Sequence, residues 1–250
     1  LLLATREKAD ALGVPEDRRL YLRGWAYAED PASIAERDDM SRSAAMAVAG
    51  RRALANAGVG LDDLGAFDLY SCFPSSVRLE CDALGLALDD PRGLTITGGL
   101  PFAGGPASAY LMHVIATAFD RLSTASGDVL VTGVGMHLAK HVAAVWSGRP
   151  GCATLPALGE AQALQAEVEA QQPRRHVLTT WSGPASVCAY TVAHGHDGAP
   201  EQGLLVLDTV QGRALARVHD ASLLAEAESA ELVGRDVVVT TDGERNVARW

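Results

Sequence analysis

The feature that most constrains this 250-residue chain is the stretch from residue 95 to residue 111, TITGGLPFAGGPASAYL. A short β-branched run leads into a turn rich in glycine and proline, and the turn opens onto a segment with apolar residues at helical spacing. Glycine lets the backbone approach a neighbouring group closely. Loops that follow strands often carry ligand-binding and reactive groups in α/β proteins. The pattern therefore predicts an α/β domain with a candidate site in this loop.

Strand and helix patterns alternate along the first 150 residues. Strands are expected at 1–4, 19–27, 66–70, 94–97, 128–132 and 141–146, and helices at 6–12, 41–57, 75–86 and 108–122. Ser41 or Ser43 is expected to cap the second helix, and Gly58 to end it. The alternation predicts a layered αβα arrangement around a mixed, five-stranded sheet.

The pattern changes after residue 150. Residues 151–176 are typical of a polar helix or linker, and short strands with Gly and Asp turns follow. Strands are expected at 177–193, 203–209, 213–219 and 235–241, and a helix at 221–232. We therefore expect a first domain over 1–150, a linker over 151–176, and a small β-rich domain over 177–250 that resembles a five-stranded OB barrel.

The net charge and the short apolar runs argue against some classes of protein. The net charge of −10 and a pI near 5.1 argue against nucleic acid as a partner. Apolar runs are far shorter than the roughly 18 residues that a membrane span needs. The four cysteines, Cys72, Cys81, Cys152 and Cys188, have no CxxC spacing. They are therefore interpreted as reduced thiols of a cytoplasmic protein, with no metal site.

A first candidate site lies where the strand at 66–70 ends, in the sequence YSCFP. Tyr70 is placed to donate a hydrogen bond to a developing oxyanion, and Cys72 lies next to a helix N-terminus, which favours a thiolate. The alternative is that both side chains pack at the end of a strand.

A second candidate site lies at residues 132–141, TGVGMHLAKH. Gly133 can present a backbone N–H to an oxyanion, and Lys140 and His141 are titratable. Strand alternation puts His137 and His141 on one face and Lys140 on the other, so they cannot all meet one ligand. The alternative is that these are surface residues of a hairpin. His113, on the helix after the glycine-rich loop, is interpreted as a core histidine.

The glycine-rich loop itself is a third candidate, because its backbone and the following helix N-terminus suit a pantetheine or a phosphate. It has neither the order of a P-loop nor that of a dinucleotide-binding loop. The alternative is a tight turn between a strand and a helix.

Together, and in this order, the three loops resemble the C-terminal half of the thiolase superfamily over about residues 1–150. Tyr70–Phe73 stands at the first thiolase motif, Gly98–Pro106 at the second, and Val131–Gly133 at the third. The β-rich tail makes the chain similar to thiolase-like protein type 1, a group commonly labelled acetyl-CoA acetyltransferase, with an additional C-terminal domain.

The resemblance implies CoA or acyl-CoA as the ligand, with Phe73, Gly99, Gly104 and Gly105 at its binding site. It implies catalytic candidates at Tyr70, Gly133, Lys140 and His141.

The departures from the thiolase pattern fall on the reacting groups. Tyr70 stands where thiolases have Asn or His, and Gly105 where they have the activating histidine. Val131, or Leu130 under a one-residue shift, stands where they have an acid–base cysteine. A glycine has no proton to transfer, so the usual Claisen route is not available from these positions.

Two hypotheses follow from these departures. One is an acyltransferase with altered acid–base groups. The other is a non-catalytic CoA-binding or scaffold partner of an enzyme of lipid metabolism. The opening sequence resembles the end of an N-terminal thiolase half, so we expect such a half as a partner. We also expect self-association through the sheet face that this half would cover.

Overall fold

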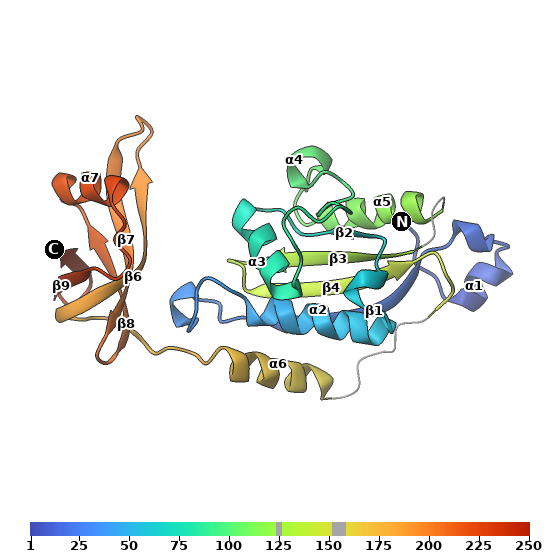
Figure 1. Ribbon diagram of the computed structural model, residues 1–250, viewed down its shortest axis with the longest axis horizontal. Helices are drawn as coiled ribbons and strands as arrows, with labels where there is room; N and C mark the ends of the chain where they lie inside the picture. The colour runs from blue at the N-terminus through green and yellow to red at the C-terminus, as the bar shows by residue number, and fades with distance from the viewer. Residues whose placement is uncertain (124–126, 152–158) are drawn as a thin grey trace. The chain divides into compact units, whose positions relative to one another are not determined.

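The computed structural model describes residues 1–123, 127–151 and 159–250, which form two compact units. The first unit comprises Leu1–Ala32 and Ser41–Gln172, and the second Ser33–Met40 and Pro173–Trp250. The first contains α1 (Arg6–Ala11), β1 (Tyr21–Glu29), α2 (Ala44–Ala57), β2 (Ala66–Asp68), α3 (Pro74–Leu84), α4 (Leu100–Ala103), α5 (Tyr110–Leu122), β3 (Asp128–Gly135), β4 (Lys140–Ser147) and α6 (Glu160–Gln171) (Figure 1). The second contains β5 (Val177–Leu178), β6 (Gly183–His194), β7 (Pro200–Thr209), β8 (Gly212–Val218), α7 (Ala221–Ser229), β9 (Asp236–Thr241) and β10 (Asn246–Arg249).

The sheet of the first unit is mixed, with the strand order β1-β4-β3-β2. The β1–β4 and β3–β4 pairs are antiparallel, whereas β2 and β3 are parallel. The mixed α/β class predicted from the sequence is confirmed, but the count of five strands is wrong for the described residues, which form four. The expected strands at 1–4 and 94–97 are absent. In the latter segment, the N–H groups of Ile96 and Thr97 donate to the Asp68 carboxylate instead of to a strand.

Local signals explain where α2 begins and ends. Ser43 is the N-cap, and its hydroxyl accepts a hydrogen bond from the backbone N–H of Met46 at 3.0 Å. Gly58 ends the helix in the left-handed conformation with φ of 69°. Both assignments had been expected from the sequence, because capping depends on residues that are near one another along the chain.

Helices cover both faces of this sheet (Figure 1). One face packs against α5, and the other packs against α2 and α3. Residues of the α5 cluster include Ala66, Val114, Val129 and Val131, and those of the α2 cluster include Val48, Phe67, Cys81 and Leu130. Successive residues of a strand therefore face different helices, which decides what each candidate residue can reach.

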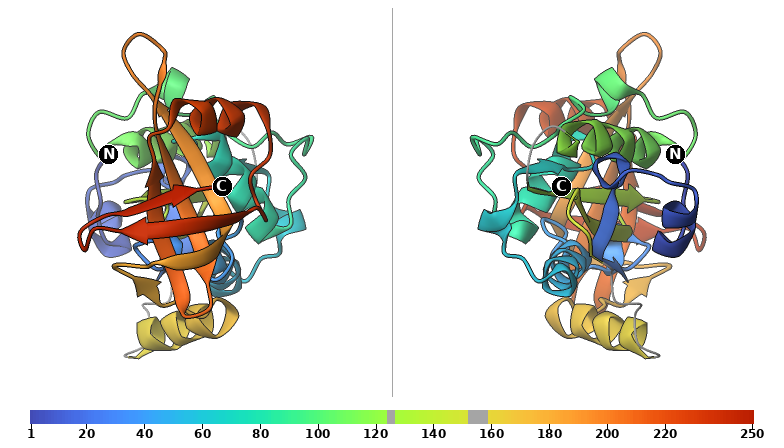
Figure 2. Two further views of the ribbon diagram at one scale, coloured as in Figure 1. Left: turned by 90° about the vertical axis from the view of Figure 1, so that its left-hand side faces the viewer. Right: turned by 90° about the vertical axis from the view of Figure 1, so that its right-hand side faces the viewer.

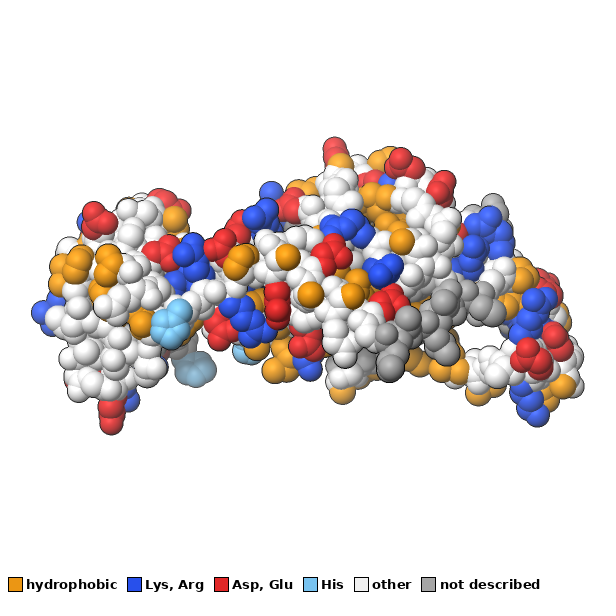
Figure 3. Space-filling model, turned by 90° about the horizontal axis from the view of Figure 1, so that it is seen from below, with side chains coloured by type: hydrophobic (Ala, Val, Ile, Leu, Met, Phe, Trp, Pro, Cys, Tyr) orange, Lys and Arg blue, Asp and Glu red, His pale blue; other side chains and the backbone are white. Residues whose placement is uncertain are grey.

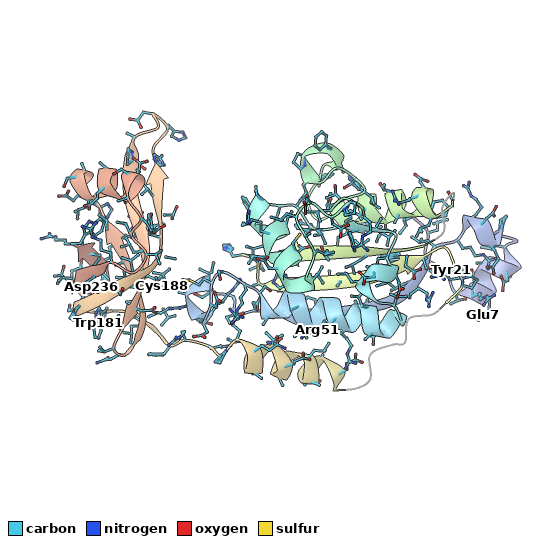
Figure 4. The ribbon with its side chains drawn as sticks, in the orientation of Figure 1. Glu7, Tyr21, Arg51, Trp181, Cys188 and Asp236 are labelled. Carbon is cyan, nitrogen blue, oxygen red and sulfur yellow. The ribbon has the colours of Figure 1, made fainter. Side chains whose placement is uncertain are left out.

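The segment at 160–171 forms a helix, α6, that packs on the first unit. Leu164 and Val168 are buried in the same cluster as α2. Arg51 of α2, labelled in Figure 4, forms an ion pair with Glu167 of α6 at 2.7 Å. The apolar contacts hold this largely polar helix to the unit, because an exposed ion pair adds little stability.

The second unit is a single sheet with the strand order β10-β9-β6-β7-β8-β5. An additional pairing of β10 with β8 makes it barrel-like, and Figure 2 shows β9 and β10 crossing in front of β6 and β7. The strands predicted at 203–209, 213–219 and 235–241 are present, and a helix lies within the predicted 221–232. The strand predicted at 177–193 is instead two strands, β5 and β6, and β10 was not predicted. The described residues form six strands rather than five, and the OB type stays a prediction.

Residues 33–40 are part of the second unit although they precede α2 in the chain. The buried guanidinium of Arg213 donates to the backbone oxygens of Arg37 and Asp38, the latter at 2.8 Å, and to Asp208 Oδ1 at 2.9 Å. Carbonyl and carboxylate partners compensate for burying its charge. No local sequence pattern marked this long-range contact.

The surface seen in Figure 3 carries acidic and basic side chains interspersed, with no large patch of one sign on that face. Among the described residues, no helix is both long and apolar enough to cross a membrane.

Candidate functional site

The first motif and the glycine-rich loop are joined directly. The Ser71 hydroxyl oxygen accepts a hydrogen bond from the backbone N–H of Leu100 at 2.9 Å. Gly99 lies beside this contact with φ of 85°, and a Cβ atom there would lie 2.7 Å from Ser71 Oγ. Both the positive φ and the close approach require glycine at this position.

Asp68 fastens the same two loops to α5. One carboxylate oxygen accepts hydrogen bonds from the backbone N–H groups of Ile96 and Thr97 and from the Thr97 hydroxyl, at 3.0, 3.1 and 2.8 Å. The other accepts from the Tyr110 hydroxyl at 2.7 Å. Asp68 is fully buried, so these donors replace the water that a carboxylate would otherwise bind.

Tyr70 lies on the α5 face of the sheet. Its ring packs edge-on against the ring of Tyr110, with centroids 5.4 Å apart. Burial, and to a lesser extent the nearby Cys72, raise the pKa of Tyr70. The phenol therefore keeps its proton at neutral pH and is able to donate a hydrogen bond.

The third motif is tied to the first directly, because the backbone N–H of Tyr70 donates to Thr132 Oγ1 at 2.9 Å, and also through Glu80 of α3. Its Oε2 accepts a hydrogen bond from the backbone N–H of Tyr70 at 3.2 Å and another from the Thr132 hydroxyl. Burial raises the pKa of Glu80 to about 8, against the opposing effect of hydrogen bonds from Thr132, Tyr70 and Ser76. We call residues 70–74, 98–106 and 132–133, which these bonds connect, the loop rim.

Two glycines among the candidate site residues, Gly105 and Gly133, are closely packed. A Cβ atom at Gly105 would lie 2.5 Å from Leu100 Cδ2 and 3.3 Å from Tyr110 Cβ. At Gly133 it would lie 2.8 Å from side-chain carbons of both Leu111 and Val142. A larger side chain at either position would therefore require its neighbours to move.

His141 is buried on the α2 face of the sheet, opposite Tyr70 and Gly133. Its Nε2 lies 3.0 Å from the Leu138 carbonyl oxygen and 3.2 Å from Asp30 Oδ2. Only 2% of its surface is exposed. This placement argues against direct contact with a ligand at the loop rim, which was one use expected of this residue.

Lys140 is exposed at the start of β4, where it pairs with Gly135 of β3 and Glu29 of β1. Between these strands, Met136 and Leu138 both have φ of 55°. Positive φ is unfavourable for such side chains, so the hairpin is locally strained.

His113 holds the glycine-rich loop from α5. Its Nδ1 lies 2.9 Å from the Ala103 carbonyl oxygen and 3.1 Å from that of Gly104. Both partners only accept, so Nδ1 carries the hydrogen and donates it. The histidine is partly buried, as expected, but it fixes the loop rather than filling the core.

The loop rim exposes two large aromatic side chains. Phe73, at the N-cap of α3, is 66% exposed, and Phe102 of α4 is 84% exposed. The Phe102 ring lies over Gly98, where a Cβ atom would be 3.2 Å from it. Exposed large apolar side chains of this kind are typical of binding surfaces.

The described residues give little support for a reactive thiolate or for a metal site. Cys72, Cys81 and Cys188 are free thiols, and Cys152 lies outside the described residues. Burial raises the pKa of Cys81 to about 11 and also raises that of Cys188, which disfavours thiolates. No group of three His, Cys, Asp or Glu side chains in the described part of the chain is arranged to hold a metal ion.

Sequence reasoning missed Asp68, Glu80 and the contact made by His113. A signal for Glu80 was present, because it falls among Val77, Cys81 and Leu84 in the apolar stripe of α3. A carboxylate on such a stripe must find buried partners.

Comparison with known proteins agrees with this arrangement. The chain is 39% identical to a monomeric SCP2-thiolase-like protein type 1 from Mycobacterium smegmatis, with a TM-score of 0.88 over 97% of this chain and 53% of that one. The chain has a thiolase-like fold. Residues 163–244 match the thiolase-like protein type 1 additional C-terminal domain. The thiolase-like chain thus spans about half the length of this relative.

Weaker likenesses extend to two other solved structures. The peroxisomal 3-ketoacyl-CoA thiolase of Saccharomyces cerevisiae has 19% identity and a TM-score of 0.42, over 58% of this chain and 38% of that one. An acetyl-CoA acetyltransferase from Syntrophomonas wolfei has 17% identity and a TM-score of 0.42, over 58% and 35%. Comparison with curated proteins finds no match.

Proposed function

We propose that this chain supplies part of a site that binds CoA or an acyl-CoA thioester, and that its own residues do not perform Claisen acid–base chemistry. The observation that carries the proposal is the loop rim. Three segments distant in sequence are hydrogen-bonded to one another, and their exposed side chains include Phe73 and Phe102.

The exposed side chains of the rim suit the apolar parts of such a ligand. Pantetheine and acyl chains are largely apolar, and exposed aromatic rings gain free energy when such groups cover them. The glycine-rich loop lets a ligand approach the backbone, because Gly104 has no neighbouring atom within 4 Å of a Cβ position. Phe73, Gly99, Gly104 and Gly105 remain our proposed ligand-binding residues.

The reacting positions support binding rather than catalysis. Gly105 has no ionisable group, and the space around it is filled by Leu100 and Tyr110. His141 is buried, and its Nε2 already contacts Asp30 and the Leu138 carbonyl oxygen. Neither residue is available as a general base at the rim.

Isothermal titration calorimetry on the 250-residue chain tests the proposal with CoA, acetyl-CoA and a long-chain acyl-CoA. We expect Phe73→Ala and Phe102→Ala each to weaken binding roughly tenfold, because each removes an exposed aromatic contact. Val233→Ala, which alters an exposed side chain of the second unit, is the control and should leave the affinity unchanged. Absence of binding to all three compounds would overturn the proposal.

A second candidate is acyl transfer with Tyr70 as hydrogen-bond donor, favoured by its protonated phenol at the rim. Thiol release from acetyl-CoA, followed with a chromogenic disulfide, distinguishes the two. Under our proposal, release stays at the background rate. Release that Tyr70→Phe abolishes, together with an acylated acceptor rather than free acetate, would instead establish acyl transfer. Under either candidate we propose a role in lipid metabolism, with a second thiolase half as partner.

A further inference from the structure

A small cavity of about 10 Å³ lies between β3, β4, α2 and α3, on the face of the sheet opposite Tyr70. Its lining includes Met46, Ala49, Gly50, Glu80, Thr132 and His141. A cavity of roughly this volume is at the lower limit for one water molecule. Three polar side chains from different elements, Glu80, Thr132 and His141, thus line the same small space.

His141 leaves one polar atom unpartnered beside this cavity. Its Nε2 faces two acceptors, the Leu138 carbonyl and Asp30, so Nε2 carries the hydrogen. Its Nδ1 is buried and has no hydrogen-bond partner in the described structure. In the neutral ring, Nδ1 is an acceptor. A buried acceptor without a partner is costly and is commonly satisfied by a donor across a bound water.

Glu80 is a second polar group of the cavity, and no Lys or Arg among the described residues forms an ion pair with it. Its only described partners are the Tyr70 N–H and the hydroxyls of Thr132 and Ser76, the last at 3.4 Å. From β2, the buried Asp68 carboxylate acts on it unfavourably. From β4, His141 faces the shared cavity, and α2 contributes only uncharged lining residues. On α3 itself, Cys81 is adjacent and disfavours a second negative charge.

We propose that Glu80 is a positioning residue that keeps its proton at neutral pH, holds the first and third loops of the rim together, and shares the cavity and one water molecule with His141 Nδ1. The protonated carboxyl group donates towards the water or the Thr132 oxygen and accepts the Tyr70 N–H. Loss of the proton places a negative charge near Asp68 with no counter-ion, and the rim loosens. The consequence for ligand affinity rests on the proposed function, whereas the consequence for the rim does not.

The pH dependence of stability tests this directly. Burial raises the pKa of Glu80 to about 8 in the folded chain, above its ordinary value of 4.5. The folded state then binds more protons at Glu80 than the unfolded state does between these values, so the contribution of Glu80 to stability is greatest below pH 4.5 and is lost as the pH rises through 8. Urea unfolding from pH 5 to pH 9 should show this fall in the wild type and a flatter profile in Glu80→Gln. The exposed Asp89→Asn should behave as wild type.

Glu80→Gln mimics the protonated group, so we expect it to match wild type at pH 5 and to exceed it at pH 9. An ionised Glu80 would instead make Glu80→Gln the less stable protein throughout, which would overturn the inference. If the variant does not fold, infrared spectroscopy of the wild type decides, because a protonated carboxyl carbonyl band must be present at pH 7 and disappear near pH 9.

Calorimetry with CoA separates this inference from the proposed function. We expect wild-type affinity to fall severalfold between pH 7 and pH 9, and the affinity of Glu80→Gln to change less. Wild type that binds no CoA but shows the pH-dependent stability would overturn the proposed function alone. Equal pH profiles of stability for the two proteins would overturn the role of Glu80 alone.

Discussion

Each face of the sheet in the first unit buries a carboxyl group near the loop rim, and the two groups differ in their hydrogen-bond partners. On the α5 face, Asp68 accepts four hydrogen bonds, from Ile96, Thr97 and Tyr110. On the α2 face, Glu80 has weaker support and shares a cavity with an unpartnered histidine nitrogen. The donors around Asp68 hold its carboxyl group in place, whereas burial with few donors favours the uncharged form of Glu80. The comparison teaches that the number of hydrogen-bond donors around a buried carboxyl group helps to decide its role.

The largest expected effect comes from removing the anchor on the α5 face. Asp68→Ala leaves the N–H groups of Ile96 and Thr97 and the Tyr110 hydroxyl buried without an acceptor. We expect it to lower the free energy of unfolding by about 3–4 kcal/mol. Urea denaturation measures this, with the exposed Asp89→Ala as control at within about 0.5 kcal/mol. Equal values for the two variants would mean that the anchor is dispensable.

An intermediate effect is expected where β3 touches α5. Gly133→Ala places a methyl group 2.8 Å from side-chain carbons of Leu111 and Val142, which must shift. We expect a loss of about 1–3 kcal/mol in the free energy of unfolding. Gly135→Ala, two residues along the same strand, meets Lys140 only at 3.5 Å and is the matched control. A Gly133→Ala variant as stable as Gly135→Ala would show that α5 packs less tightly here than the contacts indicate.

The smallest effect is expected at the contact from α5 to the glycine-rich loop. His113→Ala removes the Nδ1–H donor to the Ala103 and Gly104 carbonyls, at a cost of about 1 kcal/mol. Hydrogen exchange should show faster opening of residues 100–106 with the rest of the unit unchanged. Met112→Ala, one residue earlier and exposed, should leave exchange unaltered. Uniform exchange across the unit in His113→Ala would contradict a local role.

Most of the regular structure could be predicted because its signals are local. Ser43, one of the two caps considered, begins α2, Gly58 ends it, and Pro74 stands at the start of α3, through preferences that depend only on nearby residues. The failures share a different cause. The segment at 94–97 has the composition of a strand, but the Asp68 side chain takes the N–H groups that a strand partner would need.

The candidate site was predicted in part for the same reason. The motif order identified the loops of the rim, and Ser71 and Leu100 do join two of them. Which face each side chain occupies was decided by packing. Tyr70 and Gly133 share the α5 face, whereas His141 is buried on the other.

By itself, the sequence determined the mixed α/β class, the positions of most helices and strands, and the loops that carry the candidate site. These follow from periodicity and from capping residues, which act over a few positions. Only the tertiary structure decided which acids are buried, how many donors each receives, and which titratable groups face one cavity. Those properties depend on residues dozens of positions apart that meet only when the sheet and its helices pack together.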